Sequence, residues 1–160
     1  MKSRIIRLDK RHLKELARVD VESEHPTEEH CTLAYHEKLL RKRFKQGNEE
    51  LFGFKEGSII KGYISFKPFF PGWGPNCEAY WLAVRKQFQG QGVGSVLLRF
   101  VEARAKKKGF KKIYLYTNEI MKRARKFYEA NGYSFVNKFP GYYKHAGINH
   151  KAAALYGKSL

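Results

Sequence analysis

Apolar residues recur along the chain with two spacings, one typical of helices and one typical of strands. Helical spacing runs through residues 10–19 and again from Thr27 to Phe44. Asp9 precedes the first of these segments and is expected to cap a helix there. Thr27, which two glutamates follow, is expected to begin the second helix, because side-chain oxygens and negative charge both favour a helix N-terminus.

Alternating or continuously apolar runs predict strands around these helices. Glu56-Gly57-Ser58 separates two of the runs and indicates a hairpin. The order of elements predicts an α/β (α+β) fold with a mixed, mostly antiparallel sheet, helices on both faces and one central parallel step. The strands are expected over 3–8, 51–55, 59–67, 77–84, 111–117 and 133–139, the later helices over 96–107 and 121–131, and the tail 142–160 could supply one more strand.

Length and composition fit a single folded domain that spans residues 1–160. Apolar residues make up 42% and aromatic residues 15%, which is enough to bury a core and argues against disorder. The longest wholly apolar stretch, 79–84, is far too short to span a bilayer, and two cysteines do not make a disulfide scaffold. These features predict a soluble, cytoplasmic protein that does not bind membranes.

The charge balance is strongly basic, because 32 Lys and Arg residues stand against 15 Asp and Glu residues and give a net charge of +17. Such an excess favours anionic partners, which include nucleic acids, phosphorylated cofactors and acidic surfaces. Basic residues gather at 106–108, 111–112 and 122–126. No recognisable RNA- or DNA-binding signature accompanies them, so charge alone does not choose among these partners.

A glycine-rich turn between a predicted strand and a predicted helix is the strongest local signal. The segment from Gln89 to Ser95 reads Gln-Gly-Gln-Gly-Val-Gly-Ser. Glycines allow close approach of backbone N–H groups to a ligand, and a helix N-terminus adds unpaired donors, so the turn predicts a phosphate or pyrophosphate site. A dinucleotide site is disfavoured because Lys111-Lys112 stands where the ribose-binding acid is expected. A P-loop ending in residues 157–159 is disfavoured too, since Ala152 replaces its first glycine.

Two motifs in the correct order resemble those of the GNAT superfamily of acetyl-CoA-dependent N-acetyltransferases. Gln89, Gly92 and Gly94 match the family's Q-x-x-G-x-G pyrophosphate loop. The segment 124–133, Ala-Arg-Lys-Phe-Tyr-Glu-Ala-Asn-Gly-Tyr, is similar to the family's A-x-x-x-Y-x-x-x-G-F/Y segment. The resemblance extends from the first strand to Phe139 and implies the GNAT fold, in which the two central parallel strands splay apart.

The resemblance implies direct transfer of an acetyl group from acetyl-CoA to a primary amine, which could be a protein lysine, a protein N-terminus or a small molecule. The pantetheine arm is then expected between the strands 77–84 and 111–117. Asn118 could replace the asparagine that many relatives carry where this chain has Met121. The cofactor-binding residues implied in this way are Leu82, Ala83 and Val84, through their backbone, and Gln89, Gly90, Gln91, Gly92, Val93, Gly94 and Ser95, through their N–H groups.

Two side chains are candidates for the proton transfers that the reaction needs. Tyr128 matches the family tyrosine near the cofactor sulfur and is the candidate general acid, although it could simply be a core aromatic. Glu78 is the candidate general base, because apolar neighbours can raise the pKa of its carboxyl group toward neutrality. It could also be an exposed carboxylate at a strand end, in which case a water relay with Tyr116 or a histidine would take its place.

Several other residues have two interpretations at this stage. Cys31 with three nearby histidines matches no closed zinc spacing, so no metal is expected. Cys77 is interpreted as a packing residue. Trp73 and the tail tyrosines at 142, 143 and 156 could line the acceptor site or pack in the core. The rival function is a non-catalytic, basic nucleic-acid-binding module on the same fold, and the chain could be a monomer or a homodimer.

Overall fold

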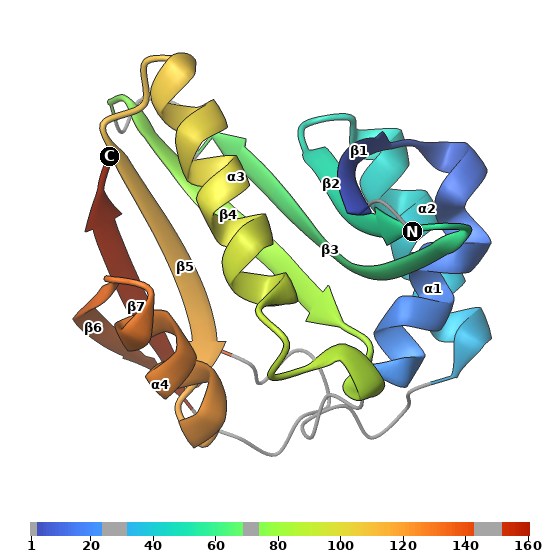
Figure 1. The fold of residues 1–160 in the computed structure, drawn as a ribbon. Coiled ribbons are helices and arrows are strands. Elements are labelled where there is room, and N and C mark those ends of the chain that lie inside the picture. The colour runs from blue at the N-terminus through green and yellow to red at the C-terminus, as the bar shows by residue number, and fades with distance from the viewer. Residues whose placement is uncertain (1–2, 24–31, 69–73, 143–151) are drawn as a thin grey trace.

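The computed structural model of the chain describes residues 3–23, 32–68, 74–142 and 152–160. They form a seven-stranded sheet with the strand order β1-β2-β3-β4-β5-β7-β6, flanked by four α-helices (Figure 1). The strands are β1 (Ser3–Leu8), β2 (Glu50–Glu56), β3 (Ile59–Pro68), β4 (Asn76–Val84), β5 (Lys112–Asn118), β6 (Ser134–Pro140) and β7 (Ala152–Ser159). The helices are α1 (Leu13–Glu22), α2 (Leu33–Gln46), α3 (Val93–Lys107) and α4 (Lys122–Ala130), with short 3-10 turns η1 (Lys10–His12) and η2 (Lys86–Phe88).

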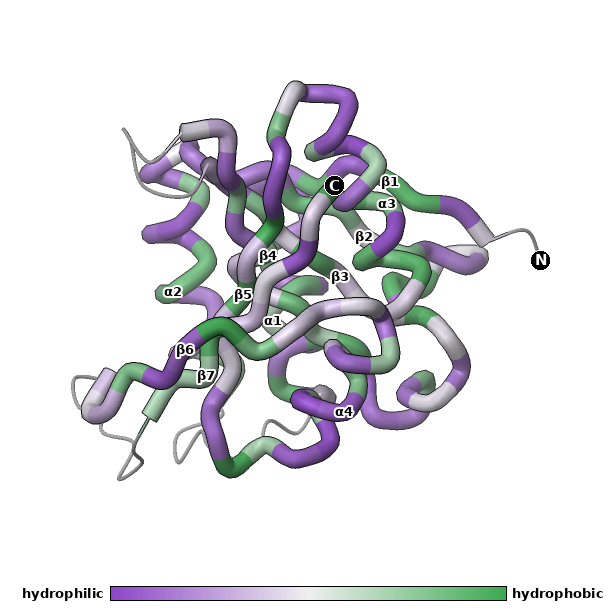
Figure 2. Tube along the Cα trace, turned by 90° about the vertical axis from the view of Figure 1, so that its left-hand side faces the viewer, coloured by the Kyte–Doolittle hydropathy of each residue, from purple (hydrophilic) through white to green (hydrophobic). Residues whose placement is uncertain are grey.

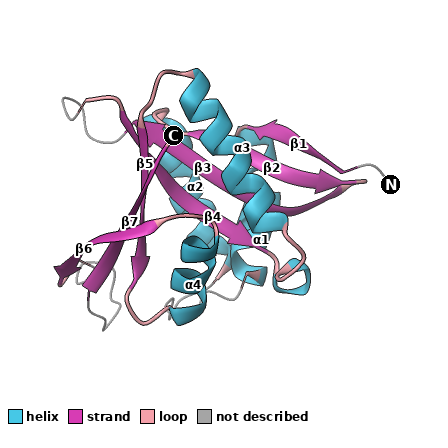
Figure 3. Ribbon diagram, turned by 60° about the vertical axis from the view of Figure 1, so that its left-hand side comes forward, coloured by secondary structure: helices cyan, strands magenta, loops and turns pink. Residues whose placement is uncertain are grey.

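Helices cover both faces of the sheet and divide the core into two layers. Helix α3 crosses one face, and α1 packs on the other, against β3 and β4, with α2 beside it (Figures 1 and 3). The layer under α3 contains Leu97, Leu98 and Val101, all fully buried. Hydrophilic and apolar residues alternate along α2, as expected of a helix with one buried side (Figure 2). None of the helices within the described ranges is long and apolar enough to cross a membrane.

Six of the seven strands were expected from the sequence, and their order is confirmed. Every neighbouring pair is antiparallel except β4 and β5, which are parallel. The tail forms β7, which inserts between β5 and β6. The place of a last strand in a sheet depends on long-range contacts, which the residue pattern of the tail does not show. The sequence therefore predicted that the tail could form a strand but not where that strand lies.

Helix starts differ most from the sequence expectation. The described part of α2 begins at Leu33, with Thr32 as its N-cap, and Thr27 lies outside the described residues. Helix α3 begins at Val93, three residues before the expected start at Val96. Gly92 takes the N-cap position with a φ of +80°, which lets the helix start inside the glycine-rich turn. Asp9 caps the first 3-10 turn as expected, through a hydrogen bond from the Arg11 N–H.

Candidate active site

Strands β4 and β5 pair over only three residues and then part. The paired positions run from Asn76 opposite Lys112 to Glu78 opposite Tyr114. Beyond Glu78, β4 continues for six residues, all but Tyr80 of which pair with β3 on one edge, whereas β5 pairs with β7. The divergence is visible in Figure 1, where the two strands separate toward the end that carries α4. The edge of β4 that faces β5 is therefore available to an extended ligand.

The three β4 residues expected to hold such a ligand, Leu82, Ala83 and Val84, differ in the side to which their backbone N–H and carbonyl groups point. The Arg85 N–H donates to the Lys61 carbonyl of β3, at 3.0 Å. Because alternate residues of an antiparallel strand direct their polar groups to the same side, Ala83 also faces β3. Leu82 and Val84 then direct their N–H and carbonyl groups toward the gap. Leu82 and Val84 are therefore the residues whose backbone could pair with an extended ligand, and Ala83, which was also expected to do so, pairs with β3 instead.

The glycine-rich turn has the geometry of an anion cradle. Gly90 and Gly92 have φ angles of +75° and +80°, and a Cβ built on either would meet no atom within 4 Å. The turn leads directly into α3, whose first N–H groups have no partner within the helix and whose dipole is positive at this end. An open cradle, positive φ angles and a helix N-terminus together fit the pyrophosphate of a coenzyme A molecule.

Gln89 supports the turn and does not itself point to a ligand. Its N–H donates to the Lys86 carbonyl at 3.1 Å. Its side-chain amide donates to the carbonyls of Ser23 and Val84, at 3.1 and 3.0 Å. These bonds join the turn to the end of α1 and the end of β4. Among the residues expected in the cradle, we therefore expect the donors to be the N–H groups from Gly90 to Ser95.

Arg85 provides a second anchor for the turn, one that the sequence motifs did not reveal. Its side chain is buried and forms ion pairs with Glu15 and Glu22 of α1. Its Nε donates to the Ile60 carbonyl at 2.8 Å. Two carboxylates one and a half to two helical turns apart on α1, facing one arginine at a strand end, form a long-range contact that local spacing cannot indicate.

Tyr128 lies beside this turn because α4 packs on the start of α3. A Cβ added to Gly94 would lie 3.0 Å from the Phe127 ring, so the two helices meet at that glycine. Tyr128 contacts the rings of Phe127, Tyr133 and Tyr156 and packs on the core layer under α3. Burial raises the pKa of Tyr128 to about 12, so its phenol keeps its proton at neutral pH. That state is the one a general acid needs.

Glu78 is buried, so it is not the exposed carboxylate that its position at a strand end also allowed. It is 8% exposed and lies at the last paired residue before β4 and β5 part. Its neighbours Cys77 and Ala79 face the α3 layer, so its own side chain faces the opposite side of the sheet. Burial raises the pKa of the Glu78 carboxyl, and Lys67, whose Nζ lies 3.7 Å from its Oε2, lowers it in part. The net direction is upward, as a general base requires.

A bulge in β4 turns two aromatic residues toward the same side of the sheet as Glu78. Ser65 pairs with Trp81 and Phe66 with Ala79, so Tyr80 has no partner across β3. Arg43 lies near both aromatic rings, 5.2 Å from the centroid of Tyr80 and 5.6 Å from that of Trp81. The bulge therefore sets the aromatic wall next to the candidate base.

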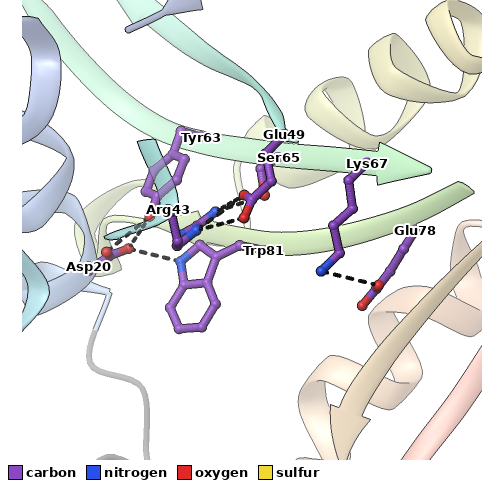
Figure 4. Close-up of polar contacts among 8 residues, drawn as sticks. All are labelled: Asp20, Arg43, Glu49, Tyr63, Ser65, Lys67, Glu78 and Trp81. Carbon is purple, nitrogen blue, oxygen red and sulfur yellow. Dashed lines mark hydrogen bonds and ion pairs between the residues drawn. The ribbon is translucent and has the colours of Figure 1, made fainter. Parts of the chain in front are cut away.

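Beneath the bulge lies a buried polar network, drawn in Figure 4. Asp20 accepts hydrogen bonds from the Tyr63 hydroxyl at 2.8 Å and from the Trp81 Nε1 at 3.0 Å. Arg43 donates to Glu49 at 2.6 Å and to the Ser65 hydroxyl at 2.9 Å. These residues come from α1, α2, β3, β4 and the segment before β2, so no local motif foretold them.

Three further sequence expectations concern single residues. The Asn118 side-chain oxygen accepts from the Ile120 N–H at 3.2 Å, which gives this residue a role in the turn that leads to α4. The Cys77 thiol is fully buried and donates to the Lys112 carbonyl at 3.6 Å, and burial raises its pKa to about 12. A neutral thiol suits packing and not nucleophilic attack. Tyr156 is buried in the core, and its hydroxyl donates to Glu129.

The remaining candidate residues fall into two groups, those outside the described residues and those that the structure places. Trp73, Tyr143, Cys31 and the histidines at 25 and 30 lie outside the described residues. His36 is fully buried on α2, with its Nδ1 3.4 Å from Asp20. Tyr116 and Tyr142 stack with ring centroids 5.0 Å apart on the Glu78 side of the sheet.

Comparison with known proteins identifies the family of the chain. The family model for GNAT acetyltransferases matches residues 13–133, about three quarters of the chain, including both β4 and the glycine-rich turn. The chain belongs to the GNAT acetyltransferase family. It is accordingly an acyltransferase, and acetyl-CoA is its cosubstrate.

Solved structures agree with this assignment at the level of the fold. A GNAT-family protein from Desulfovibrio desulfuricans has a TM-score of 0.82 and 21% identity, with 99% of each chain covered. The ribosomal-protein-S18-alanine N-acetyltransferase from Escherichia coli has a TM-score of 0.78 and 16% identity, covering 99% of this chain and 94% of that one. The PaiA N-acetyltransferase from Thermoplasma acidophilum, solved with coenzyme A, has a TM-score of 0.75 and 19% identity, with both chains fully covered. No curated protein sequence gives a significant match.

Proposed function

We propose that this GNAT acetyltransferase moves the acetyl group directly from acetyl-CoA to a primary amine in a ternary complex. The observation that carries the proposal is the combination of the gap between β4 and β5 with the open cradle at the start of α3. In the bound state acetyl-CoA supplies an activated thioester. The N–H groups from Gly90 to Ser95 hold its pyrophosphate, and the backbone of Leu82 and Val84 holds its arm.

The candidate base and acid approach the gap from opposite faces of the sheet. Glu78 lies on the side of α1 and α2, and Tyr128 packs on the side of α3. An amine that enters from the Glu78 side therefore meets the thioester between the two groups. This arrangement places one group for each of the two proton transfers that direct transfer involves.

Glu78 removes the proton that an amine must lose before it can attack. A carboxylate with a raised pKa accepts a proton from an ammonium group more readily than an exposed one does. The Tyr128 hydroxyl gives a proton to the departing thiolate and keeps that proton until then, because its own pKa is high. Cys77 takes no part, since its thiol is neutral and faces the core.

Exposed basic residues next to the glycine-rich cradle fit the binding of an anionic cofactor there. Lys122, Arg123 and Lys126 are exposed on α4, next to the cradle, and favour the approach of an anion. The basic cluster at residues 106–112 lies at the other end of α3, about 20 Å away for a helix of this length. The two clusters do not form one continuous stripe, which weakens the alternative of a nucleic-acid-binding module.

The test is calorimetric titration of acetyl-CoA and of CoA into the wild type and two glycine variants. Gly92→Ala places a methyl group in the cradle at a φ of +80°. Gly109→Ala places one at a φ of +88°, equally free of contacts, at the far end of α3. Both substitutions cost about 1 kcal/mol of backbone strain, so both lower stability equally. We expect Gly92→Ala to weaken CoA binding at least tenfold and Gly109→Ala to leave it unchanged.

Two results would overturn the proposal. Absence of acetyl-CoA binding to the wild type would remove the catalytic function. Equal weakening by both variants would show that the loss comes from stability and that the cradle is not the phosphate site. With binding established, release of the CoA thiol is followed with a panel of amines.

A further inference from the structure

Glu78 and three tyrosines form a cluster on the acceptor side of the sheet, to which the sequence motifs gave no role as a group. Tyr80 belongs to the β4 bulge, Tyr116 to β5, and Tyr142 follows β6. The rings of Tyr116 and Tyr142 are nearly parallel, with an interplanar angle of 14°. Glu78, Tyr116 and Tyr80 all lie close enough to Tyr142 to add to the effect of burial, which raises the pKa of its phenol to about 12. We call these four residues the tyrosine–carboxylate cluster.

A lysine of the chain itself already places its ammonium group in this cluster. The Nζ of Lys67 lies 3.6 Å from the centroid of the Tyr80 ring and 3.7 Å from the Glu78 carboxylate. Figure 4 shows its side chain reaching from β3 to Glu78. A cation between an aromatic face and a carboxylate is stabilised by both the ring quadrupole and the opposite charge. Lys67 therefore reveals which chemistry the cluster recognises.

We propose, on the basis of the proposed function above, that the acceptor is an alkylammonium group at the end of an unbranched chain, like a lysine side chain. Its ammonium displaces Lys67 and lies between Glu78 and the ring of Tyr80. Its methylene stem lies against the rings of Tyr116 and Tyr142. Glu78 then takes one proton from the ammonium, and the amine nitrogen forms a bond to the acetyl carbon as the carbon–sulfur bond breaks. The nitrogen loses its second proton to solvent, and the thiolate takes a proton from the Tyr128 hydroxyl and leaves as CoA.

The surroundings of the cluster distinguish this acceptor from other amines. A polyamine or amino sugar needs several carboxylates, but the nearest other carboxylate, Glu49, is 3% exposed and is bound to Arg43. A peptide N-terminus places a polar amide directly next to its amine, where the cluster offers aromatic surfaces. An aliphatic stem that ends in one cation matches both the single carboxylate and the rings.

The first experiment compares acceptors at saturating acetyl-CoA. The probes are a short peptide with a blocked N-terminus and one lysine, the same peptide with a free N-terminus and no lysine, and spermidine. We expect kcat/KM for the lysine peptide to exceed that for the other two at least tenfold. A preference for the free N-terminus or for spermidine would overturn the inference.

The second experiment tests the role of Lys67 and Tyr80 in acceptor binding. Lys67→Met removes the internal competitor and should lower the acceptor KM about threefold to tenfold. Lys61→Met is the matched control, because Lys61 is another β3 lysine that pairs with a glutamate, Glu56, and lies over a ring, Phe88, but away from Glu78. Tyr80→Leu should raise the acceptor KM about tenfold, whereas Tyr80→Phe, which keeps the ring face, should change it less than threefold.

These outcomes separate the inference from the proposed function. If the wild type binds acetyl-CoA and acetylates amines, but Lys67→Met and Lys61→Met have the same acceptor KM, the inference fails and the proposed function stands. Equal effects of Tyr80→Leu and Tyr80→Phe on the acceptor KM would likewise overturn the inference and leave the proposed function standing. If the wild type does not bind acetyl-CoA, both fail. Circular dichroism and thermal unfolding of each variant establish that a change in KM does not come from unfolding.

Discussion

The contact between Gly94 and Phe127 makes a prediction in which two opposing effects can be weighed. Gly94 lies in the first turn of α3 with an ordinary helical φ, so alanine there gains roughly 0.5–1 kcal/mol at most from lower backbone freedom in the unfolded chain. Its Cβ would lie 3.0 Å from Cζ and 3.4 Å from Cε2 of the Phe127 ring. The ring cannot move freely, because it contacts Tyr128 at a centroid distance of 5.3 Å. Crowding of this kind costs roughly 1–3 kcal/mol.

Crowding therefore prevails, and Gly94→Ala should lower the free energy of unfolding by about 1 kcal/mol. For a chain of this size that corresponds to a fall of about 2–4 °C in the melting temperature. Urea denaturation of a double-mutant cycle with Phe127→Leu measures the coupling. In the Phe127→Leu background the shorter side chain removes the contact, and Gly94→Ala should become neutral or stabilising.

The same displacement should reach the reaction, because Phe127 and Tyr128 are neighbours on α4. Gly94→Ala should reduce kcat more than it weakens CoA binding, since the cradle at Gly90 and Gly92 is left intact. The reasoning is refuted if Gly94→Ala stabilises the wild type, or if it has the same effect on stability with and without the Phe127 ring.

Three further predictions concern the reacting groups and their support. Burial holds the pKa of Glu78 above its usual value, so kcat/KM should fall as pH decreases through that raised pKa. Lys67→Met removes a cation that lowers the Glu78 pKa and should therefore move the fall in kcat/KM to higher pH. A pH profile that Lys67→Met leaves unchanged would contradict the role of Glu78 as base. Tyr128→Phe should reduce kcat about 100-fold and change acetyl-CoA affinity less than twofold in calorimetry, so an unchanged kcat would remove Tyr128 as the acid. Tyr63→Phe takes away a hydrogen bond to the buried Asp20 carboxylate and should cost about 1.5–3 kcal/mol in urea denaturation. A loss below about 0.5 kcal/mol would show that Trp81 and His36 satisfy the carboxylate without it.

Local patterns in the sequence were enough for most of the fold. The hairpin at Gly57 and the strand–turn–helix at Gln89 are each encoded within a few residues, and both appear as expected. The start of α3 was placed three residues late because Gly94 was treated as part of a loop. Its neighbours show why a glycine belongs in the helix, since a side chain there would meet α4.

The candidate site was predicted less completely than the fold, because half of it depends on contacts across the sheet. The cradle and Tyr128 belong to motifs of consecutive residues. By contrast, Lys67 meets Glu78 through the register of β3 and β4, and Trp81 faces the same side as Glu78 and Tyr80 only because the strand bulges. A bulge changes which side of a sheet a residue faces, and nothing in an alternating apolar pattern marks its position.

If Glu78 binds the acceptor ammonium as proposed, its burial explains how a strongly basic protein can use a carboxylate for this purpose. With a net charge of +17, an exposed glutamate on this surface would attract the chain's own lysines and arginines. Burial limits the competitors of Glu78 to the one cation that strand register places beside it, Lys67, while Arg43 is bound to Glu49 and Ser65 below. A single internal cation, weakly held at 3.7 Å, can be exchanged for a substrate without opening the polar network beneath it. We infer that the buried pairs of Arg43 and Asp20 keep the floor of the acceptor site rigid, so that acceptor binding requires only the Lys67 side chain to move.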